Sequence, residues 1–266
     1  MNGGFNRWKA CRFGIMLYNV NDSYIGQSLE RYGEYSFGES DLFRQIVQPG
    51  DVVVEVGANI GAHTLQLAQL AGPTGEVHAF EPQRLVFQAL CANMALNSVA
   101  NTRCYPLAVG REQGTILVPF LDPSTTNNFG GLSLIDRRRG DRVTVTTVDA
   151  LELKTCRLLK IDVEGMEREV ILGAVETIRR TSPYLYVEND RESKSDDLLR
   201  TIAALGYDLY QHEPPLFNPE NFLGDPENIF GDIVSANLVC VPRTLGVAVE
   251  GSERVVPPDE ADPTAE

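Results

Sequence analysis

The segment from residue 55 to residue 64 combines an acid, a glycine turn and the start of a helix. It reads Glu-Val-Gly-Ala-Asn-Ile-Gly-Ala-His-Thr and follows a run of valines. Gly57 lets the chain leave a strand sharply, Gly61 lets the next helix pack closely, and the unpaired N–H groups of that helix favour an anionic group. Twenty-six residues after Glu55, Glu81 ends the next apolar run, where a carboxylate can accept two hydrogen bonds from a ribose diol. The sequence therefore predicts a site for an adenosine-containing ligand.

The glycine pattern distinguishes two ligands of this kind, NAD and S-adenosylmethionine. Dinucleotide binding requires G-x-G-x-x-G so that the backbone can approach a pyrophosphate, but Asn59 occupies the middle position here. A methionine moiety presents one carboxylate, and Glu55 suits its ammonium group better than it suits phosphates. We therefore expect S-adenosylmethionine as the cofactor. The residues expected to bind it are Glu55, Gly57, Asn59, Gly61, Thr64, Glu81, Pro82, Ala108 (near the adenine) and Asp162.

Three other interpretations stay open. An NAD-dependent oxidoreductase is disfavoured by Asn59 and by the lack of a Tyr-x-x-x-Lys pair on a later helix. A non-catalytic protein that binds an adenosine ligand would keep Glu81 and the glycine turn without an acceptor pocket. The segment could also be a tight strand-to-helix turn, with Glu81 an unrelated acid, and it would then bind no adenosine ligand.

The elements that position these residues alternate between strands and helices. Helices are expected at 41–47, 62–71, 85–96, 165–180 and 195–205, and strands at 51–56, 77–80, 101–107, 158–161, 184–187, 207–210 and 237–241. This alternation predicts a doubly wound α/β fold with a Rossmann-like sheet of seven strands. An inserted β-hairpin or flap is expected at about 114–148, in which Arg137 to Arg139 form a solvated turn or else contact an anionic acceptor.

The chain is expected to contain one principal domain at residues 49–245. An irregular lead-in or lid at 1–48 precedes it. The segment 246–266 is acidic and rich in proline, so we expect it to be disordered.

Several stretches resemble the FkbM family of methyltransferases that use S-adenosylmethionine. The similarity runs from about Gly33 to about Val241 and is carried by the residues 49–51, 55–61, 80–82, 127–131 and, most specifically, 159–167 (Leu-Lys-Ile-Asp-Val-Glu-Gly-Met-Glu). The resemblance implies a seven-stranded methyltransferase fold and O-methylation of a hydroxyl on a small molecule, sugar or natural product. It also places Asp162 at the methyl-transfer position.

Methyl transfer to an alcohol requires a group that accepts the hydroxyl proton. Asp162 follows the strand at 158–161 and is the expected catalytic residue, although it could also cap the next helix. His63, in the first turn after Gly61, is a second candidate base or else shapes the turn. His212, in the loop after Tyr210, is a third candidate base or else a solvated residue.

The acceptor is expected to contact Asn128 and Gly130 in the flap and Glu188 and Asn189 after a later strand. Oxygen ligands from Asp162, Glu188 and Asn189 could instead hold Mg²⁺, as in catechol-type O-methyltransferases, but we expect no metal. The long aromatic loop that begins at Glu213 is expected to bind the acceptor, and Tyr24, Tyr32 and Tyr35 to form part of a lid.

The composition excludes several classes of protein. The 266 residues carry a formal charge of −14, which opposes binding to nucleic acid. The five cysteines form no CxxC pair, so neither a disulfide framework nor a structural zinc site is expected, and a cytoplasmic location fits best. No apolar run is long enough to predict a membrane span.

Overall fold

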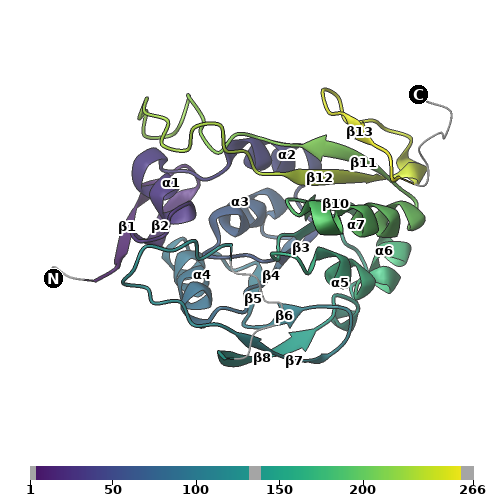
Figure 1. Ribbon diagram of the computed structural model, residues 1–266, viewed down its shortest axis with the longest axis horizontal. Helices are drawn as coiled ribbons and strands as arrows, with labels where there is room; N and C mark the ends of the chain where they lie inside the picture. Colours follow the sequence, from purple (N-terminus) through teal and green to yellow (C-terminus); the bar gives the residue numbers. More distant parts are fainter. Residues whose placement is uncertain (1–3, 132–138, 259–266) are drawn as a thin grey trace.

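The computed structural model describes residues 4–131 and 139–258, and a sheet of eight strands forms its centre (Figure 1). The strand order is β13-β11-β12-β10-β9-β3-β4-β5. Neighbouring strands from β10 to β5 are parallel, whereas β12 is antiparallel to both β10 and β11. The predicted seven-stranded, doubly wound α/β sheet is confirmed, with one short strand added at its edge.

The strands of this sheet have the following bounds: β3 Val52–Val56, β4 Glu76–Phe80, β5 Thr102–Tyr105, β9 Leu158–Ile161, β10 Tyr184–Glu188, β11 Tyr207–His212, β12 Asn237–Pro242 and β13 Arg254–Val255. Because β3, β4 and β9 are buried on both faces, their side chains form nearly continuous apolar runs. The strand order reverses between β3 and β9, and such a switch point is where open α/β sheets bind ligands.

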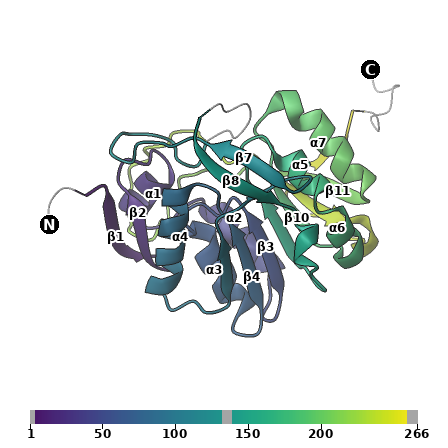
Figure 2. The same cartoon turned by 90° about the horizontal axis from the view of Figure 1, so that it is seen from below.

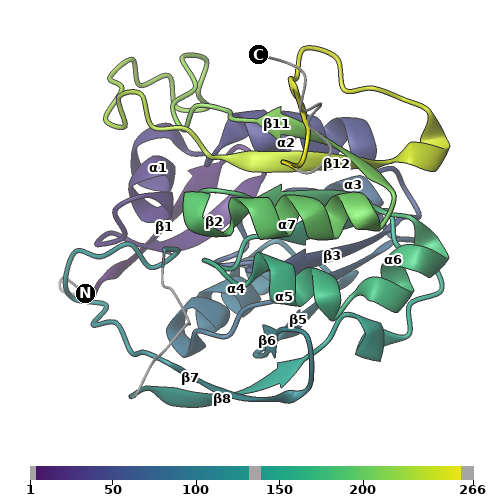
Figure 3. The ribbon, with the colours of Figure 1, turned by 45° about the vertical axis from the view of Figure 1, so that its right-hand side comes forward.

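Helices cover both faces of the sheet, and Figure 3 shows α5, α6 and α7 in front of it with α2 and α3 behind. Their bounds are α1 Ile25–Tyr32, α2 Phe37–Ile46, α3 Ala62–Ala71, α4 Arg84–Leu96, α5 Glu167–Leu172, α6 Val175–Thr181 and α7 Glu192–Ala204, with 3-10 turns at Asp149–Leu151 and Arg243–Leu245. Alternate residues of β3 divide between the two layers. Val54 and Val56 pack towards α5–α7, whereas Val53 packs with α2 and α3. None of the helices within 4–131 and 139–258 has the length and apolar character that crossing a bilayer requires.

The insertion forms a second, smaller sheet. Its strands β7 (Gly114–Val118) and β8 (Asp141–Thr146) pair antiparallel, which confirms the predicted hairpin, and β6 (Ala108–Val109) adds parallel to β8. Figure 2 shows this small sheet crossing the end of the main one. Arg137 and Arg138 of the predicted turn lie outside the described residues.

Three expectations about elements are wrong. The lead-in is not irregular: β1 (Asn6–Cys11) and β2 (Gly14–Asn19) form a hairpin, and α1 follows it, because each buries an apolar face. The single helix expected at 165–180 is two helices that break at Gly173, where a Cβ would overlap the carbonyl oxygen of Gly110. The tail is not wholly disordered, since β13 pairs with β11; residues 259–266 are not among those described.

Candidate active site

A cavity of about 260 Å³ lies at the carboxyl ends of β3, β4, β9 and β10. The glycine turn, the flap, the lead-in and the loop before β12 all contribute to its wall. Among the described residues, six carboxylates and one lysine line it: Glu55, Glu81, Asp162, Glu164, Glu188, Asp190 and Lys160. The cavity therefore favours a ligand that carries positive charge and hydrogen-bond donors.

Gly57 brings the ends of β3 and β9 together. Its φ is +84°, a left-handed conformation, and a Cβ at this position would overlap the backbone carbonyl oxygen of Asp162. Only glycine meets both conditions, so the turn can pass directly beside the residue that follows β9.

Glu81 connects the second strand to the glycine turn. Its carboxylate accepts hydrogen bonds from the backbone N–H of Asn59 at 3.0 Å and of Gln83 at 2.8 Å. Asn59 has a φ of +49°, which asparagine tolerates better than most residues. Glu81 is only 3% exposed, and burial raises its pKa to about 7. The carboxylate is thus fixed in place at the cavity wall and retains lone pairs for a ligand's hydroxyl groups.

Glu55 lies deeper, at 1% exposure, on the face of the sheet that α2 and α3 cover. The Thr64 hydroxyl donates to its Oε2 at 2.6 Å, and the Lys160 ammonium lies 3.9 Å from its Oε1. Burial raises the pKa of Glu55 to about 7, and the Lys160 charge opposes this rise. Thr64 does not line the cavity; it orients Glu55 from behind.

Asp162 and His63 both reach the cavity. The Asp162 side chain is 41% exposed, and Lys160 donates to its Oδ2 at 3.3 Å. His63 is 5% exposed, and burial lowers its pKa, so its imidazole is neutral near pH 7. Its Nδ1 lies 3.9 Å from Glu39 Oε2, and its Nε2 has no hydrogen-bond partner among the described residues. Both residues could therefore take part in proton transfer.

Several predicted site residues do not line this cavity. His212 ends β11, and its Nδ1 lies 2.9 Å from the Tyr186 hydroxyl, so the structure does not support its prediction as a base. Ala108 is buried in β6, whose pairing with β8 takes it away from the main sheet. Gly61 and Pro82 shape the turns after β3 and β4 without reaching the wall.

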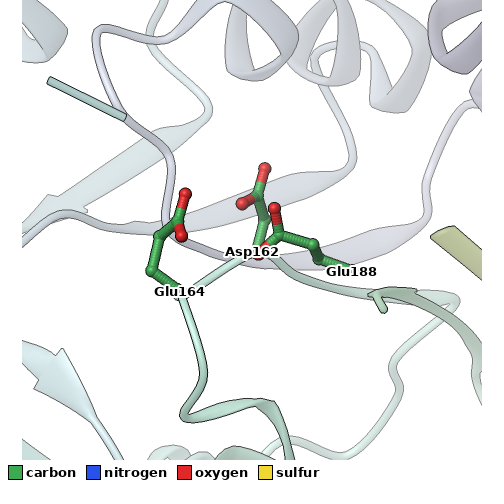
Figure 4. A group of neighbouring side chains, drawn as sticks. All are labelled: Asp162, Glu164 and Glu188. Carbon is green, nitrogen blue, oxygen red and sulfur yellow. The ribbon is translucent and has the colours of Figure 1, made fainter. Parts of the chain in front are cut away.

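The carboxylates at the ends of β9 and β10 form one group. Oxygen atoms of Asp162, Glu164 and Glu188 lie within 4.8 Å of one another, and Figure 4 shows the three side chains converging on the same space. Asn189 does not join this group as expected, because its side-chain amide donates to the Ser195 hydroxyl at 3.0 Å. Burial raises the pKa of both Glu164 and Glu188. Arg191 partly neutralises the group, with its Nη2 2.6 Å from Glu164.

The flap and the lid residues close the cavity from outside. Asn128, Gly130 and Gly131 line it, as do Tyr24 and Tyr35. A Cβ on Gly130 would lie 3.2 Å from the Asn59 side chain, so the flap sits close to the glycine turn. Tyr32 does not line the cavity; it packs behind it among aromatic side chains.

The loop between β11 and β12 covers the remaining side. Leu216 and the stretch 233–236 line the cavity, and Phe217 and Phe230 pack against Tyr32 with ring centroids 5.3 and 5.9 Å away. The loop expected to bind the acceptor therefore borders the cavity.

Four functional candidates are absent from the sequence analysis: Glu164 and Asp190 of the cavity wall, and the more deeply buried Lys160 and Glu39. Lys160 lies between Leu159 and Ile161 in a strand with no exposed residue, and a lysine there was a signal that could have been used. Glu39 is buried at 3% exposure in α2, where its neighbours in the sequence give no such signal.

Comparisons with known proteins point to one family of enzymes. The model of the FkbM methyltransferase domain matches residues 55–209. The 31-O-demethyl-FK506 methyltransferase FkbM of Streptomyces tacrolimicus is 29% identical over 204 residues, which cover 64% of this chain and 78% of that protein. The hexuronic acid methyltransferase AglP of Haloferax volcanii is 29% identical over 152 residues, which cover 53% of this chain and 59% of that protein.

A crystal structure of an FkbM methyltransferase from Methylobacillus flagellatus shares the fold. Its TM-score is 0.50 at 19% identity, and the match covers 82% of this chain and 55% of that one. The match to the family model extends over more than half of the chain and includes the glycine turn, Glu81 and Asp162. The chain belongs to the FkbM family of methyltransferases.

Proposed function

We propose that this methyltransferase uses S-adenosylmethionine to methylate a hydroxyl oxygen of a small molecule or sugar. The observation that carries the proposal is the pairing of Glu81 with the glycine turn. A buried carboxylate, held by two backbone N–H groups, faces a cavity beside a turn that only glycine can form. This arrangement suits a ribose diol next to an amino-acid end.

The charges around the cavity favour this cofactor over a dinucleotide. S-adenosylmethionine supplies a methyl group on a positively charged sulfur, and it also carries an ammonium group. The six lining carboxylates would attract both charges, and Glu55 is buried where it could bind the ammonium. The same carboxylates would repel a pyrophosphate, which weighs against an NAD-dependent oxidoreductase.

Proton removal from the acceptor is assigned to Asp162, with His63 as a second base. Asp162 is the more accessible of the two, and Lys160 holds its Oδ2. Its Oδ1 could accept the hydroxyl proton of an acceptor that enters beside Glu164 and Glu188. Asn128 and Gly130 would contact that acceptor from the flap.

The names of the relatives support the acceptor class. One is a methyltransferase for 31-O-demethyl-FK506, and another is a hexuronic acid methyltransferase. Both names describe small-molecule or sugar acceptors, so we propose an acceptor of that class here.

Isothermal titration calorimetry with S-adenosylmethionine, S-adenosylhomocysteine and NAD tests the cofactor. We expect the first two to bind and NAD not to bind. Binding of NAD alone would overturn the proposal in favour of an oxidoreductase.

Turnover is tested with a radiolabelled methyl donor and a panel of polyols, sugars and macrolide alcohols. Asp162→Asn should lower kcat at least 100-fold, the low end of the usual contribution of a general base, while changing cofactor affinity little. Cofactor binding without turnover on any alcohol would favour a non-catalytic binding protein, and an unchanged kcat in Asp162→Asn would remove Asp162 from the mechanism.

A further inference from the structure

We propose that Lys160 is a positioning residue that keeps Glu55 ionised, so that the Glu55 carboxylate can bind the ammonium group of the methyl donor. This role rests on the proposed function and adds to it a residue that the family comparison does not assign.

The two side chains lie opposite each other on neighbouring strands. Lys160 of β9 is the register partner of Glu55 of β3, and both face α2 and α3. The Lys160 Nζ lies 3.9 Å from Glu55 Oε1 and 3.3 Å from Asp162 Oδ2. At 2% exposure, this ammonium is among the most buried charges of the described chain. A buried lysine is costly unless anions compensate it, and here two carboxylates do so.

Within the part of the chain that the structure describes, the surroundings of Glu55 are otherwise anionic or neutral. The titratable groups that face Glu55 or Lys160 are Glu39 on α2, His63 on α3, Glu81 after β4, Cys104 on β5, Asp162 after β9 and Tyr186 on β10. Lys160 is the cation in this set. Burial lowers its pKa, but the fields of Asp162, Glu55 and Glu39 together raise that pKa above its usual value, so Lys160 stays charged.

Lys160 therefore decides the charge of Glu55 near neutral pH. Burial raises the pKa of Glu55 to about 7 even with Lys160 present. Without the Lys160 ammonium, no nearby positive charge opposes the two effects that raise the Glu55 pKa, which are desolvation and the charges of the neighbouring carboxylates. The Glu55 pKa therefore rises further. A protonated Glu55 has lost the charge that an ammonium ligand needs.

The test compares wild type with Lys160→Met by calorimetry, using S-adenosylhomocysteine between pH 6.5 and 8.5. Each unit of rise in the Glu55 pKa costs a factor of about ten in the ionised fraction below that pKa. For a rise of about one unit, we expect the variant to bind about tenfold more weakly at pH 6.5 and less than about 1.5-fold more weakly at pH 8.5. The readout is the ratio of the wild-type affinity to the variant affinity at each pH. Glu81 titrates in both proteins, so its effect cancels in this ratio.

Two controls separate this role from a structural one. Lys160→Arg keeps the charge and should retain the wild-type pH profile. In a Glu55→Gln background, Lys160→Met should change the affinity by the same factor at every pH. If Lys160→Met fails to fold, Lys160→Gln replaces it in both comparisons.

The outcomes are distinct. If the ratio of wild-type to Lys160→Met affinity is constant across pH in proteins that retain Glu55, the inference is overturned. That result would indicate a direct contact between Lys160 and the ligand, or packing alone, and would leave the proposed function intact. If wild type fails to bind S-adenosylhomocysteine at any pH, the proposed function and this inference fail together.

Discussion

Glu81 shows how a single side chain can serve both the fold and the site. Its two hydrogen bonds to backbone N–H groups fix the glycine turn relative to β4, and the same carboxylate faces the cavity. Because these two hydrogen bonds already hold the carboxylate in place, it needs no rearrangement to accept hydrogen bonds from a ligand's hydroxyl groups.

Glu81→Gln should therefore weaken S-adenosylhomocysteine binding by about 1–3 kcal/mol, the usual cost of losing charge-assisted hydrogen bonds. Calorimetry at pH 8, where Glu81 is ionised, measures the change. Glu76→Gln is the matched control, because Glu76 begins β4, the strand that Glu81 follows, but pairs with Arg103 on the surface. Equal affinities in wild type and Glu81→Gln would contradict the ribose assignment.

The sequence predicted the residues of the site that belong to local patterns. Gly57, Asn59 and Glu81 follow from a strand, a turn and the next strand end, whose geometry is set within about thirty residues. Lys160 and Glu39 join the site only because distant elements bury them together. Such burial depends on tertiary packing, which spacing along the chain does not reveal.

At the scale of elements, the approach of β3 to β9 depends on Gly57. Gly57→Ala should destabilise the protein by more than the roughly 1–2 kcal/mol that a left-handed conformation costs an L-residue, because the new Cβ would also overlap the Asp162 carbonyl. Urea unfolding measures the difference.

Gly206 supplies the control for this prediction. Its φ is +89°, close to the +84° of Gly57, but a Cβ there would meet no atom of the described residues within 4 Å. Gly206→Ala should thus show the conformational cost alone. If the two alanine variants were equally stable, the close approach of the two strand ends would not matter to the fold.

The ends of β9 and β10 provide a second prediction at this scale. Arg191 already pairs with Glu164 in the carboxylate group, so Mg²⁺ would have to compete with a guanidinium. Millimolar Mg²⁺ or EDTA should change the wild-type Tm by less than about 1 °C, well under 1 kcal/mol.

Arg191→Gln removes the competing cation and should make the protein more responsive to Mg²⁺ in the same thermal assay. A wild type that Mg²⁺ strongly stabilises, with the gain reversed by EDTA, would instead favour a metal-assisted mechanism.

The strand-helix alternation was sufficient to predict the class of fold and most element positions. It failed where a short element depends on long-range packing. The hairpin of β1 and β2 is stabilised by contacts with α4, for example from Asn93 to both backbone groups of Leu17. The break between α5 and α6 exists because Gly173 passes the backbone of Gly110, more than sixty positions earlier.

For the molecule as a whole, a cavity built from buried carboxylates has a cost in stability. Glu81 has an ordinary pKa of 4.5 and a folded-state pKa of about 7. Between these values the folded protein binds more protons than the unfolded chain, so this residue's contribution to the free energy of unfolding falls as pH rises. The loss reaches about 3 kcal/mol and is complete just above pH 7.

Glu81→Gln cannot lose a proton and should escape this loss. The free energy of unfolding of the variant minus that of wild type should therefore increase from pH 5 to pH 8, as measured by urea unfolding of the ligand-free proteins. The buried histidines, whose pKa values are lowered, contribute equally to both proteins and cancel in the difference.

Saturating S-adenosylhomocysteine at pH 8 should then stabilise wild type more than the variant, because binding adds stability in proportion to the logarithm of affinity. If the difference in the free energy of unfolding between Glu81→Gln and wild type stayed constant with pH, burial would not raise the pKa of Glu81. The binding site would then have no cost in stability at this residue.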